Sequence, residues 1–236
     1  MSKTMKSKRS LEKATSTFRI TEAYKILRTN LQFAMASNNQ KVVLVSSAEP
    51  SVGKSTTIAN LALTTAQKGE KVLLIEADMR KPKQHRLFRI RNEKGLSDML
   101  GGFATFEDAV HKNIVNNLDL ITAGRIPPNP SELLGSRTMH EFLDWANGQY
   151  DVILIDTPPI NVVADLNVLA VHTGGVLLVA RYKSTTYMEL EAACENVKKV
   201  GGTILGVVIN GVSEPSGSYG YNYKKYYSYH QKYAEQ

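Results

Sequence analysis

One stretch decides the fold: Ala48-Glu-Pro-Ser-Val-Gly53-Lys54-Ser55-Thr56. It has the spacing of a P-loop, with Ala48 in place of the first glycine. It lies between an apolar run that ends at Ser47 and an amphipathic segment that begins near Ser55, which predicts strand, loop and helix. Backbone N–H groups in such a loop, together with the positive end of the helix, attract phosphates. The residues expected to contact a nucleotide are Ser51, Val52, Gly53, Lys54, Ser55 and Thr56.

The residues of this loop differ in what they can do. Gly53 lets the backbone approach a phosphate closely, because it has no Cβ. Lys54 can reach the β- and γ-phosphates, and the Ser55 hydroxyl can bind Mg²⁺. The loop therefore predicts a site for a nucleotide with Mg²⁺.

Two further apolar runs end in carboxylates, at Glu76-Ala-Asp78 and at Asp156. Ligands of open α/β sheets bind at the carboxyl ends of strands, so these groups lie beside the P-loop if their strands are its neighbours. We expect Asp156 to bind Mg²⁺, directly or through water, and Asp78 to be a base or a second contact to Mg²⁺. The spacing is compatible with either assignment of the two roles. Glu76 is out of line with both, which favours a structural acid.

Short β-branched runs alternate with amphipathic segments along the chain, which predicts a parallel sheet with helices on both faces. The expected fold class is therefore α/β, of the P-loop NTPase type. Strands are predicted at Val42–Ser47, Lys71–Ala77, Leu118–Thr122, Asp151–Asp156, Gly175–Ala180 and Leu205–Asn210. Helices are predicted at Thr21–Ala36, Ser55–Lys68, Glu132–Ala146 and Thr186–Val200.

The 236 residues are 42% apolar and 22% charged, which is typical of one globular domain with flexible ends. We expect a basic flexible N-terminus over 1–18, a P-loop domain over 19–211 and a disordered Tyr-rich tail over 212–236. Apolar runs fall short of the roughly 18 residues of a membrane helix, and none follows the basic start as in a secretory signal. Cys194 is the single cysteine, so a cytoplasmic setting without disulfides or zinc is expected.

The net charge of +7 is concentrated in two segments, 1–13 and 79–92. The second segment holds six basic residues and no carboxylate. An anionic partner and an ordinary solvated face are both compatible with this pattern. Nucleic acid is not expected as a partner, because the two basic segments contain a single aromatic residue, Phe88, on which a base could stack.

Seven of the eleven tyrosines lie in the last eighteen residues. Their Gly, Ser, Lys, Asn and His neighbours provide no regular apolar pattern, which argues against a role in a core. An adhesive aromatic tail and a set of phosphate acceptors are the two interpretations. The tyrosines are Tyr219, Tyr221, Tyr223, Tyr226, Tyr227, Tyr229 and Tyr233.

The predicted helix over 21–36 carries a charged face beside its apolar stripe. Glu22, Lys25 and Arg28 recur every third residue on this face. Spacing alone favours an ordinary surface helix with local ion pairs, and a contact face between subunits is the alternative.

Taken together, these motifs resemble the bacterial tyrosine kinases of capsular and exopolysaccharide assembly, in their separate cytoplasmic form. The resemblance covers most of residues 20–236, and its combination of motifs is specific. The matching segments are Glu22–Asn30, the P-loop, Glu76–Pro82, Pro127–Leu134, Asp156–Pro159 and the tyrosine cluster.

The resemblance implies ATP- and Mg²⁺-dependent phosphorylation of the tail tyrosines between subunits of a ring-like oligomer, with Lys54, Asp78 and Asp156 serving the transfer. It also implies a membrane-embedded chain-length regulator of polysaccharide export as activator, recruitment to the inner face of the plasma membrane, and a tyrosine phosphatase that reverses the reaction. The charged face of 21–36 resembles the subunit contact of the family. In related folds an asparagine placed as Asn210 contacts adenine, although burial at a strand end explains it equally well.

The sequence departs from the family at several positions. Glu76 stands where Asp is usual, and Lys25 replaces an arginine of the contact motif, with loss of bidentate pairing. The main alternative is a partition- or division-type switch ATPase of the same fold. Such proteins usually carry a lysine early in the P-loop, where this chain has Glu49, and they leave the tail tyrosines unexplained. A nucleotide-bound scaffold with an adhesive tail is a further alternative.

Overall fold

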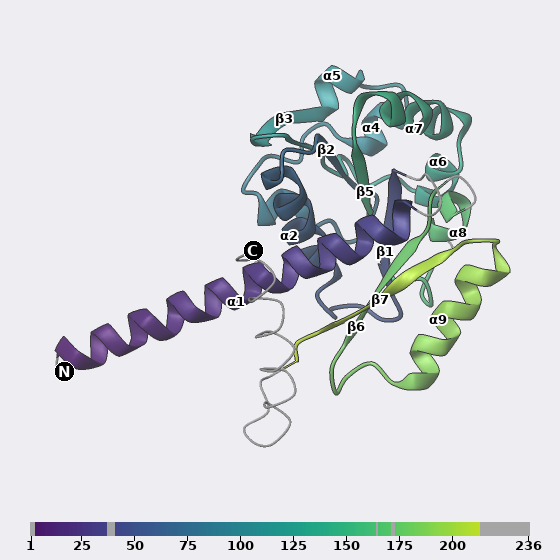
Figure 1. The fold of residues 1–236 in the computed structure, drawn as a ribbon. Helices are drawn as coiled ribbons and strands as arrows, with labels where there is room; N and C mark the ends of the chain where they lie inside the picture. Colours follow the sequence, from purple (N-terminus) through teal and green to yellow (C-terminus); the bar gives the residue numbers. More distant parts are fainter. Residues whose placement is uncertain (1–2, 37–40, 164, 171–172, 213–236) are drawn as a thin grey trace.

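The computed structural model describes residues 3–36, 41–163, 165–170 and 173–212. A seven-stranded sheet with the order β3-β4-β2-β5-β1-β6-β7 forms its centre (Figure 1). Every neighbouring pair is parallel except β3 and β4. The strands are β1 (Val42–Ser47), β2 (Val72–Glu76), β3 (Val110–Val115), β4 (Leu118–Ile121), β5 (Val152–Asp156), β6 (Val176–Arg181) and β7 (Ile204–Asn210).

The central strands are buried on both faces, because their side chains alternate between two apolar layers. On β1, Leu44 belongs to one core cluster, whereas Val43 and Val45 belong to the other. Helices α1 and α2 contribute to the second layer, and α4, α6, α7, α8 and α9 contribute to the first. The predicted fold class, a mainly parallel sheet with helices on both faces, is therefore confirmed.

The helices in the described residues are α1 (Lys3–Ala36), α2 (Lys54–Gln67), α3 (Gln84–Leu87), α4 (Leu96–Leu100), α5 (Phe106–Ala109), α6 (Pro130–Leu134), α7 (Arg137–Gln149), α8 (Asp165–Ala170) and α9 (Tyr187–Lys199). The single helix predicted over Glu132–Ala146 is wrong, because two helices occupy this region. Gly135 ends α6, and the Ser136 hydroxyl accepts a hydrogen bond from the N–H of Met139 and caps α7.

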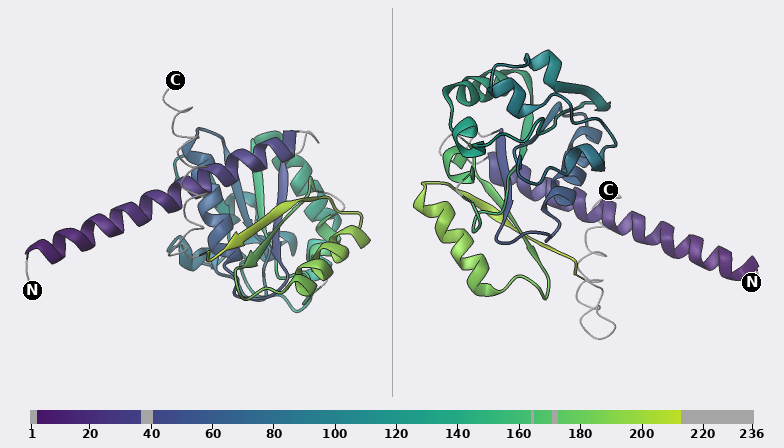
Figure 2. Two further views of the ribbon diagram at one scale, coloured as in Figure 1. Left: turned by 60° about the horizontal axis from the view of Figure 1, so that its bottom comes forward. Right: turned by 180° about the vertical axis from the view of Figure 1, so that it is seen from behind.

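Helix α1 is longer than the sequence predicted. It runs without a break from Lys3, whereas the expected helix began at Thr21 and followed a flexible segment over 1–18. The stretch from Lys3 to Ala36 contains neither Gly nor Pro, so nothing in it interrupts helix formation. Leu31 and Met35 pack its C-terminal part against the domain, while its N-terminal part projects away (Figures 1 and 2).

Strand β3 was not predicted. It forms an antiparallel edge with β4, and half of its six residues are exposed and half are polar, so the continuous apolar pattern of a buried strand is absent. Asn113, where the pairing of β3 is irregular, and Asn117, in the turn before β4, adopt positive φ angles of 49° and 65°. Asparagine tolerates this conformation better than most residues, which permits the irregularity and the tight return between the two strands.

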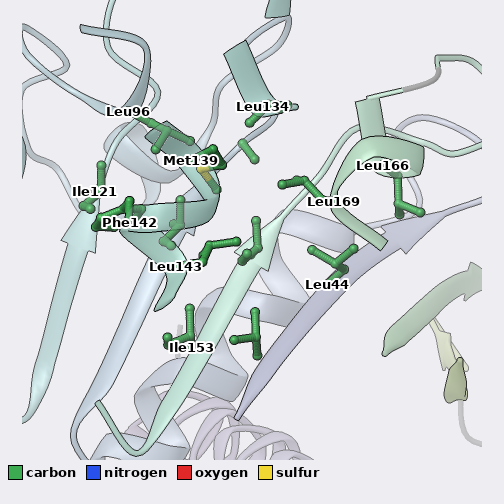
Figure 3. Packing of buried hydrophobic residues seen from close by; sticks show 14 of the residues in the cluster. Leu44, Leu96, Ile121, Leu134, Met139, Phe142, Leu143, Ile153, Leu166 and Leu169 are labelled. Atoms are coloured by element: carbon green, nitrogen blue, oxygen red, sulfur yellow. The ribbon is translucent and has the colours of Figure 1, made fainter. Parts of the chain in front are cut away.

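The larger core layer lies between the sheet and the helices α4, α6, α7 and α8. Figure 3 shows Leu44 of β1 beside Leu166 and Leu169 of α8. Ile153 of β5 lies on the side of α7, which contributes Met139, Phe142 and Leu143 to the same layer. This packing fixes the carboxyl ends of β1 and β5, where the candidate site lies.

The predicted tyrosine acceptors lie outside the described residues, since the structure describes nothing from 213 to 236. Among the described helices, none combines the length and the apolar character needed to cross a membrane.

Candidate functional site

The loop between β1 and α2 has the backbone geometry of a phosphate cradle. Gly53 adopts φ 97° immediately before the first residue of α2, in the left-handed region that favours glycine. Ser51 also has a positive φ, of 67°, at a position where glycine is common in such loops. The departure from glycine at Ser51 therefore does not prevent the turn.

Asn210, the last residue of β7, holds this loop from the side. Its Nδ2 donates a hydrogen bond to the carbonyl of Val52 at 2.9 Å. A Cβ added to Gly53 would lie 2.1 Å from the same Nδ2, so the contact requires glycine. The structure thus places Asn210 at the P-loop, where its amide contacts protein backbone.

Lys54 lies between two carboxylates at the start of α2. Its Nζ forms an ion pair with Asp156 Oδ1 and lies 3.7 Å from Asp78 Oδ2. The three side chains are buried or nearly so. Burial raises the pKa of the Asp78 carboxyl above its ordinary value, and the Lys54 ammonium opposes this shift. The structure therefore brings together Lys54, Asp78 and Asp156, the three residues that the resemblance assigned to phosphoryl transfer.

The strand order explains how Asp78 reaches the site. β2 is not a neighbour of β1, because β5 lies between them. Asp156 ends β5 and pairs in register with Glu76 of β2 and with Val45 of β1. The N–H groups of Ala77 and Asp78 both donate to the carbonyl of Asp156, at 2.8 and 2.9 Å. These bonds turn the chain after β2 toward Lys54.

Glu76 does not face Lys54. Its Oε1 accepts hydrogen bonds from the N–H groups of Lys83 and Gln84, the second at 2.6 Å, and Oε2 accepts a longer one from Ala123 at 3.4 Å. Burial raises the pKa of Glu76 to about 7, although these backbone donors oppose the shift. Through its hydrogen bonds to the N–H groups of Lys83 and Gln84, Glu76 organises the loop after β2.

Gln84 is a residue of the site that the sequence pattern did not predict. It is fully buried, and its Nε2 donates to Asp156 Oδ2 at 2.7 Å and to the Ser55 carbonyl at 3.1 Å. The residue lies within the basic segment 79–92, where charge dominates the pattern. No feature of its type or spacing indicates this contact, which depends on the tertiary fold.

A second link, between an exposed arginine and a buried carboxylate, connects the loop after β2 to the Pro127–Leu134 segment. Arg80 forms a bidentate ion pair with Asp165, with both N–O distances at 3.0 Å. The Ser131 hydroxyl donates to the same buried carboxylate. Two motifs that the sequence places far apart therefore meet at the start of α8 through Asp165.

Glu49, at the position where switch ATPases carry lysine, has a structural partner. Its Oε1 accepts hydrogen bonds from the Thr185 hydroxyl at 2.9 Å and the Ser184 hydroxyl at 3.3 Å. The loop after β6 therefore holds the carboxylate at the rim of the P-loop.

The proposed contact face on α1 divides in two. Lys25 and Glu22 form an ion pair at 2.7 Å on the outer side of the helix. Arg28 instead turns toward α2, where its Nη1 donates to the Thr64 carbonyl at 2.9 Å. Arg28 therefore contributes to packing within the chain, whereas Glu22 and Lys25 remain accessible.

The arrangement fits a nucleotide with Mg²⁺. The cradle, the Lys54 ammonium and the N-terminus of α2 supply the positive groups that phosphates need. In the described part of the chain, no three His, Cys, Asp or Glu side chains cluster to hold a metal ion by themselves. Mg²⁺ is usually held by one or two protein groups, waters and the phosphates of the substrate. The candidate groups are Ser55, Asp78 and Asp156. Ser55 is buried in the first turn of α2, while Thr56 beside it is exposed.

The fold and the site define a nucleotide-binding domain of the P-loop class, and comparisons agree. Residues 40–205 match the family described as AAA domain. The chain is 40% identical over 206 residues to the tyrosine-protein kinase wzc of Salmonella typhimurium, covering 87% of this chain and 29% of that protein. It therefore spans a little under a third of this curated relative's length.

Comparison with solved structures identifies the family within the P-loop class. The kinase domain of Escherichia coli tyrosine kinase ETK is 37% identical and superposes with a TM-score of 0.80, covering 84% of this chain and 78% of that one. The septum site-determining protein MinD of Pyrococcus horikoshii, complexed with Mg-ADP, is 24% identical with a TM-score of 0.63, covers 74% and 72%, and shares the fold alone. The chain belongs to the bacterial tyrosine kinase family.

Proposed function

We propose that this chain is an ATP-dependent protein-tyrosine autokinase that phosphorylates its C-terminal tyrosine cluster in trans and regulates capsular or extracellular polysaccharide synthesis and export. One observation carries the proposal: Lys54, at the start of α2, is buried between Asp156 and Asp78. The desolvation of buried charges offsets most of the attraction between them, so a role in stability alone does not explain this constellation. Family membership supplies the class of reaction.

The proposed roles follow from position. Lys54 and the loop residues 51–56 would hold the phosphates, and Ser55 and Asp156 would hold Mg²⁺. Asn210, whose amide bonds to the P-loop backbone, would contact adenine. Bound Mg²⁺ would neutralise the charge that develops on the phosphates.

Asp78 has a raised pKa because of burial, which makes it a better proton acceptor than an exposed aspartate. The tyrosine oxygen would bond to the γ-phosphorus as the bond to ADP breaks, and Asp78 would accept the phenolic proton. A second contact to Mg²⁺ is the alternative role of Asp78.

The proposal includes partners. A membrane-embedded chain-length regulator would activate the chain and recruit it to the inner face of the plasma membrane, and a tyrosine phosphatase would reverse the modification. A ring-like homo-oligomer would present each tail to the site of a neighbour. Glu22 and Lys25 are the accessible part of the contact face that we propose for this ring.

The competing function is a switch ATPase of the partition and division type, and the likeness to MinD shows only that the fold is shared. Transfer of label from γ-labelled ATP, followed by phosphoamino acid analysis, separates the two. We expect labelled phosphotyrosine in the wild-type chain and in Lys68→Met, and loss of the label in Lys54→Met. Hydrolysis of ATP without phosphotyrosine, with the activator present, would favour the switch ATPase.

The same assay distinguishes the two roles of Asp78. If Asp78 is the base, Asp78→Asn lowers transfer strongly while leaving the Mg²⁺-dependent affinity for ADP close to the wild-type value. If it contacts Mg²⁺, the substitution lowers that affinity as well.

A further inference from the structure

Gln84 connects three parts of the phosphate site. It is the first residue of α3 and is fully buried. Its Nε2 bonds to the carboxylate of Asp156, at the end of β5, and to the carbonyl of Ser55, in the first turn of α2. One side-chain amide therefore spans the loop after β2, the end of β5 and the helix that follows the P-loop.

The orientation of this amide is determined by its partners. A carboxylate and a carbonyl are both acceptors, so the NH₂ group must face them. Among the residues that the structure describes, Gln84 Oε1 is buried and has no hydrogen-bond partner. Leaving a buried acceptor unpaired has a cost, and buried polar groups in native proteins are usually paired. The two hydrogen bonds that the NH₂ group donates, to Asp156 and to the Ser55 carbonyl, offset this cost.

The backbone of Gln84 is held as firmly as its side chain. Its N–H donates to Glu76 Oε1 at 2.6 Å, and the N–H of Lys83 donates to the same oxygen. Glu76 is itself fully buried at the end of β2. The carboxylate of Glu76 therefore fixes the start of α3 relative to the sheet, and the Gln84 amide extends from a rigid base.

Asp156 is held at both oxygens. Oδ1 pairs with Lys54, and Oδ2 accepts the bond from Gln84. Without the second bond the carboxylate could rotate about its terminal torsion, which is a soft degree of freedom for aspartate. Groups that bond to the far oxygen of a metal-binding carboxylate orient it, and their loss typically weakens metal binding.

We propose that Gln84 is a positioning residue for Mg²⁺-dependent nucleotide binding, acting by holding Asp156 Oδ2 and tying it to the first turn of α2. The inference rests on the proposed assignment of Asp156 to Mg²⁺. It does not require tyrosine transfer, so it can be tested by binding alone.

The experiment measures the affinity of the full chain for fluorescent ADP, once with Mg²⁺ and once with EDTA. The ratio of the two dissociation constants reports the contribution of the metal. Gln84→Leu removes the amide at similar volume, and Gln84→Met is a second, unbranched replacement. Gln32→Leu is the matched control, because Gln32 bonds to Glu70, which follows the C-terminal end of α2, whereas the site lies at its N-terminal end. Asp156→Asn tests the premise, and thermal melting monitors the fold.

We expect the Mg²⁺ ratio to fall about 10-fold or more in Gln84→Leu and Gln84→Met, while the affinity in EDTA and the ratio in Gln32→Leu stay near wild type. An unchanged ratio in the two Gln84 variants overturns the proposal. An unchanged ratio in Asp156→Asn overturns it through its premise. Failure of both Gln84 variants to fold assigns the amide to stability and also overturns it. Absence of tyrosine transfer in the wild type would contradict the proposed function and leave this result standing.

Discussion

Lys54 and Asp156 form a buried ion pair that joins two units of the fold 102 residues apart in sequence. Lys54 begins α2 after the P-loop, and Asp156 ends β5, whose register with β1 aligns the two strand ends. Removing one partner of a buried pair leaves the other charge without compensation. The pair is therefore where binding chemistry and stability depend on the same atoms.

Lys54→Met is expected to abolish tyrosine transfer and to destabilise the fold by about 3 kcal/mol at neutral pH. The Asp78 carboxyl then loses the cation that opposes the rise in its pKa, so its protonated form is favoured further in the folded state. Because the folded state binds more protons than the unfolded one, the deficit should grow as pH rises. Denaturant unfolding at several pH values measures this, and Lys68→Met serves as the surface control. A deficit that does not change with pH would contradict the expected coupling.

Glu76 should make the fold less stable as pH rises. Its pKa is raised from 4.5 to about 7 by burial, so the folded state holds a proton that the unfolded state releases earlier. The cost of ionising it accumulates above the unfolded pKa and is complete above the folded pKa, at about 7. We expect Glu76→Gln to flatten the fall in unfolding free energy over this range. A wild-type pH profile retained in the variant would exclude Glu76 as its source.

Gly53→Ala is expected to lower both stability and nucleotide affinity. The new Cβ would meet Asn210 Nδ2 at 2.1 Å, and the residue would be strained at φ 97°. Gly69→Ala is a matched control, because Gly69 has φ 101° and a Cβ there meets nothing within 4 Å. The control should show the backbone strain alone, about 1 kcal/mol, with unchanged affinity for ADP. Equal effects on affinity would show that the cradle does not depend on this contact.

Substitutions in the two parts of the charged face on α1 should have different effects on stability and on the oligomer. Arg28→Ala removes the bond to the Thr64 carbonyl and is expected to lower the melting temperature. Lys25→Ala breaks only an exposed ion pair, so the melting temperature should hold while the proposed oligomer weakens. Light scattering and thermal melting distinguish the variants. An oligomer that persists in a Glu22→Ala, Lys25→Ala double variant would place the contact elsewhere.

The sequence was most informative where the pattern was local. The P-loop, the buried strands and the acidic strand ends each occupy a short window with a strong apolar signal. Such a signal is lacking in the edge strand β3, at the break after α6 and in the N-terminal part of α1. The first was not predicted, and the other two were predicted wrongly.

The site was predictable as a set of residues but not as an arrangement. Placing β5 between β1 and β2 is a property of the whole topology, and it makes Asp156 the direct partner of Lys54. Gln84 and the Arg80–Asp165 pair lie in contacts between distant segments, so no single window contains their signal. The side chains that orient the binding residues through tertiary contacts could therefore not be predicted from the sequence alone.

Tyrosine autophosphorylation is tested most directly by mass spectrometry of the full chain after incubation with Mg²⁺-ATP, with and without the activator's cytoplasmic segment. We expect successive additions of one phosphoryl group each, mapped by peptide analysis to tyrosines between Tyr219 and Tyr233 and lost in Lys54→Met. Consumption of ATP with an unmodified tail, even with the activator present, would contradict it.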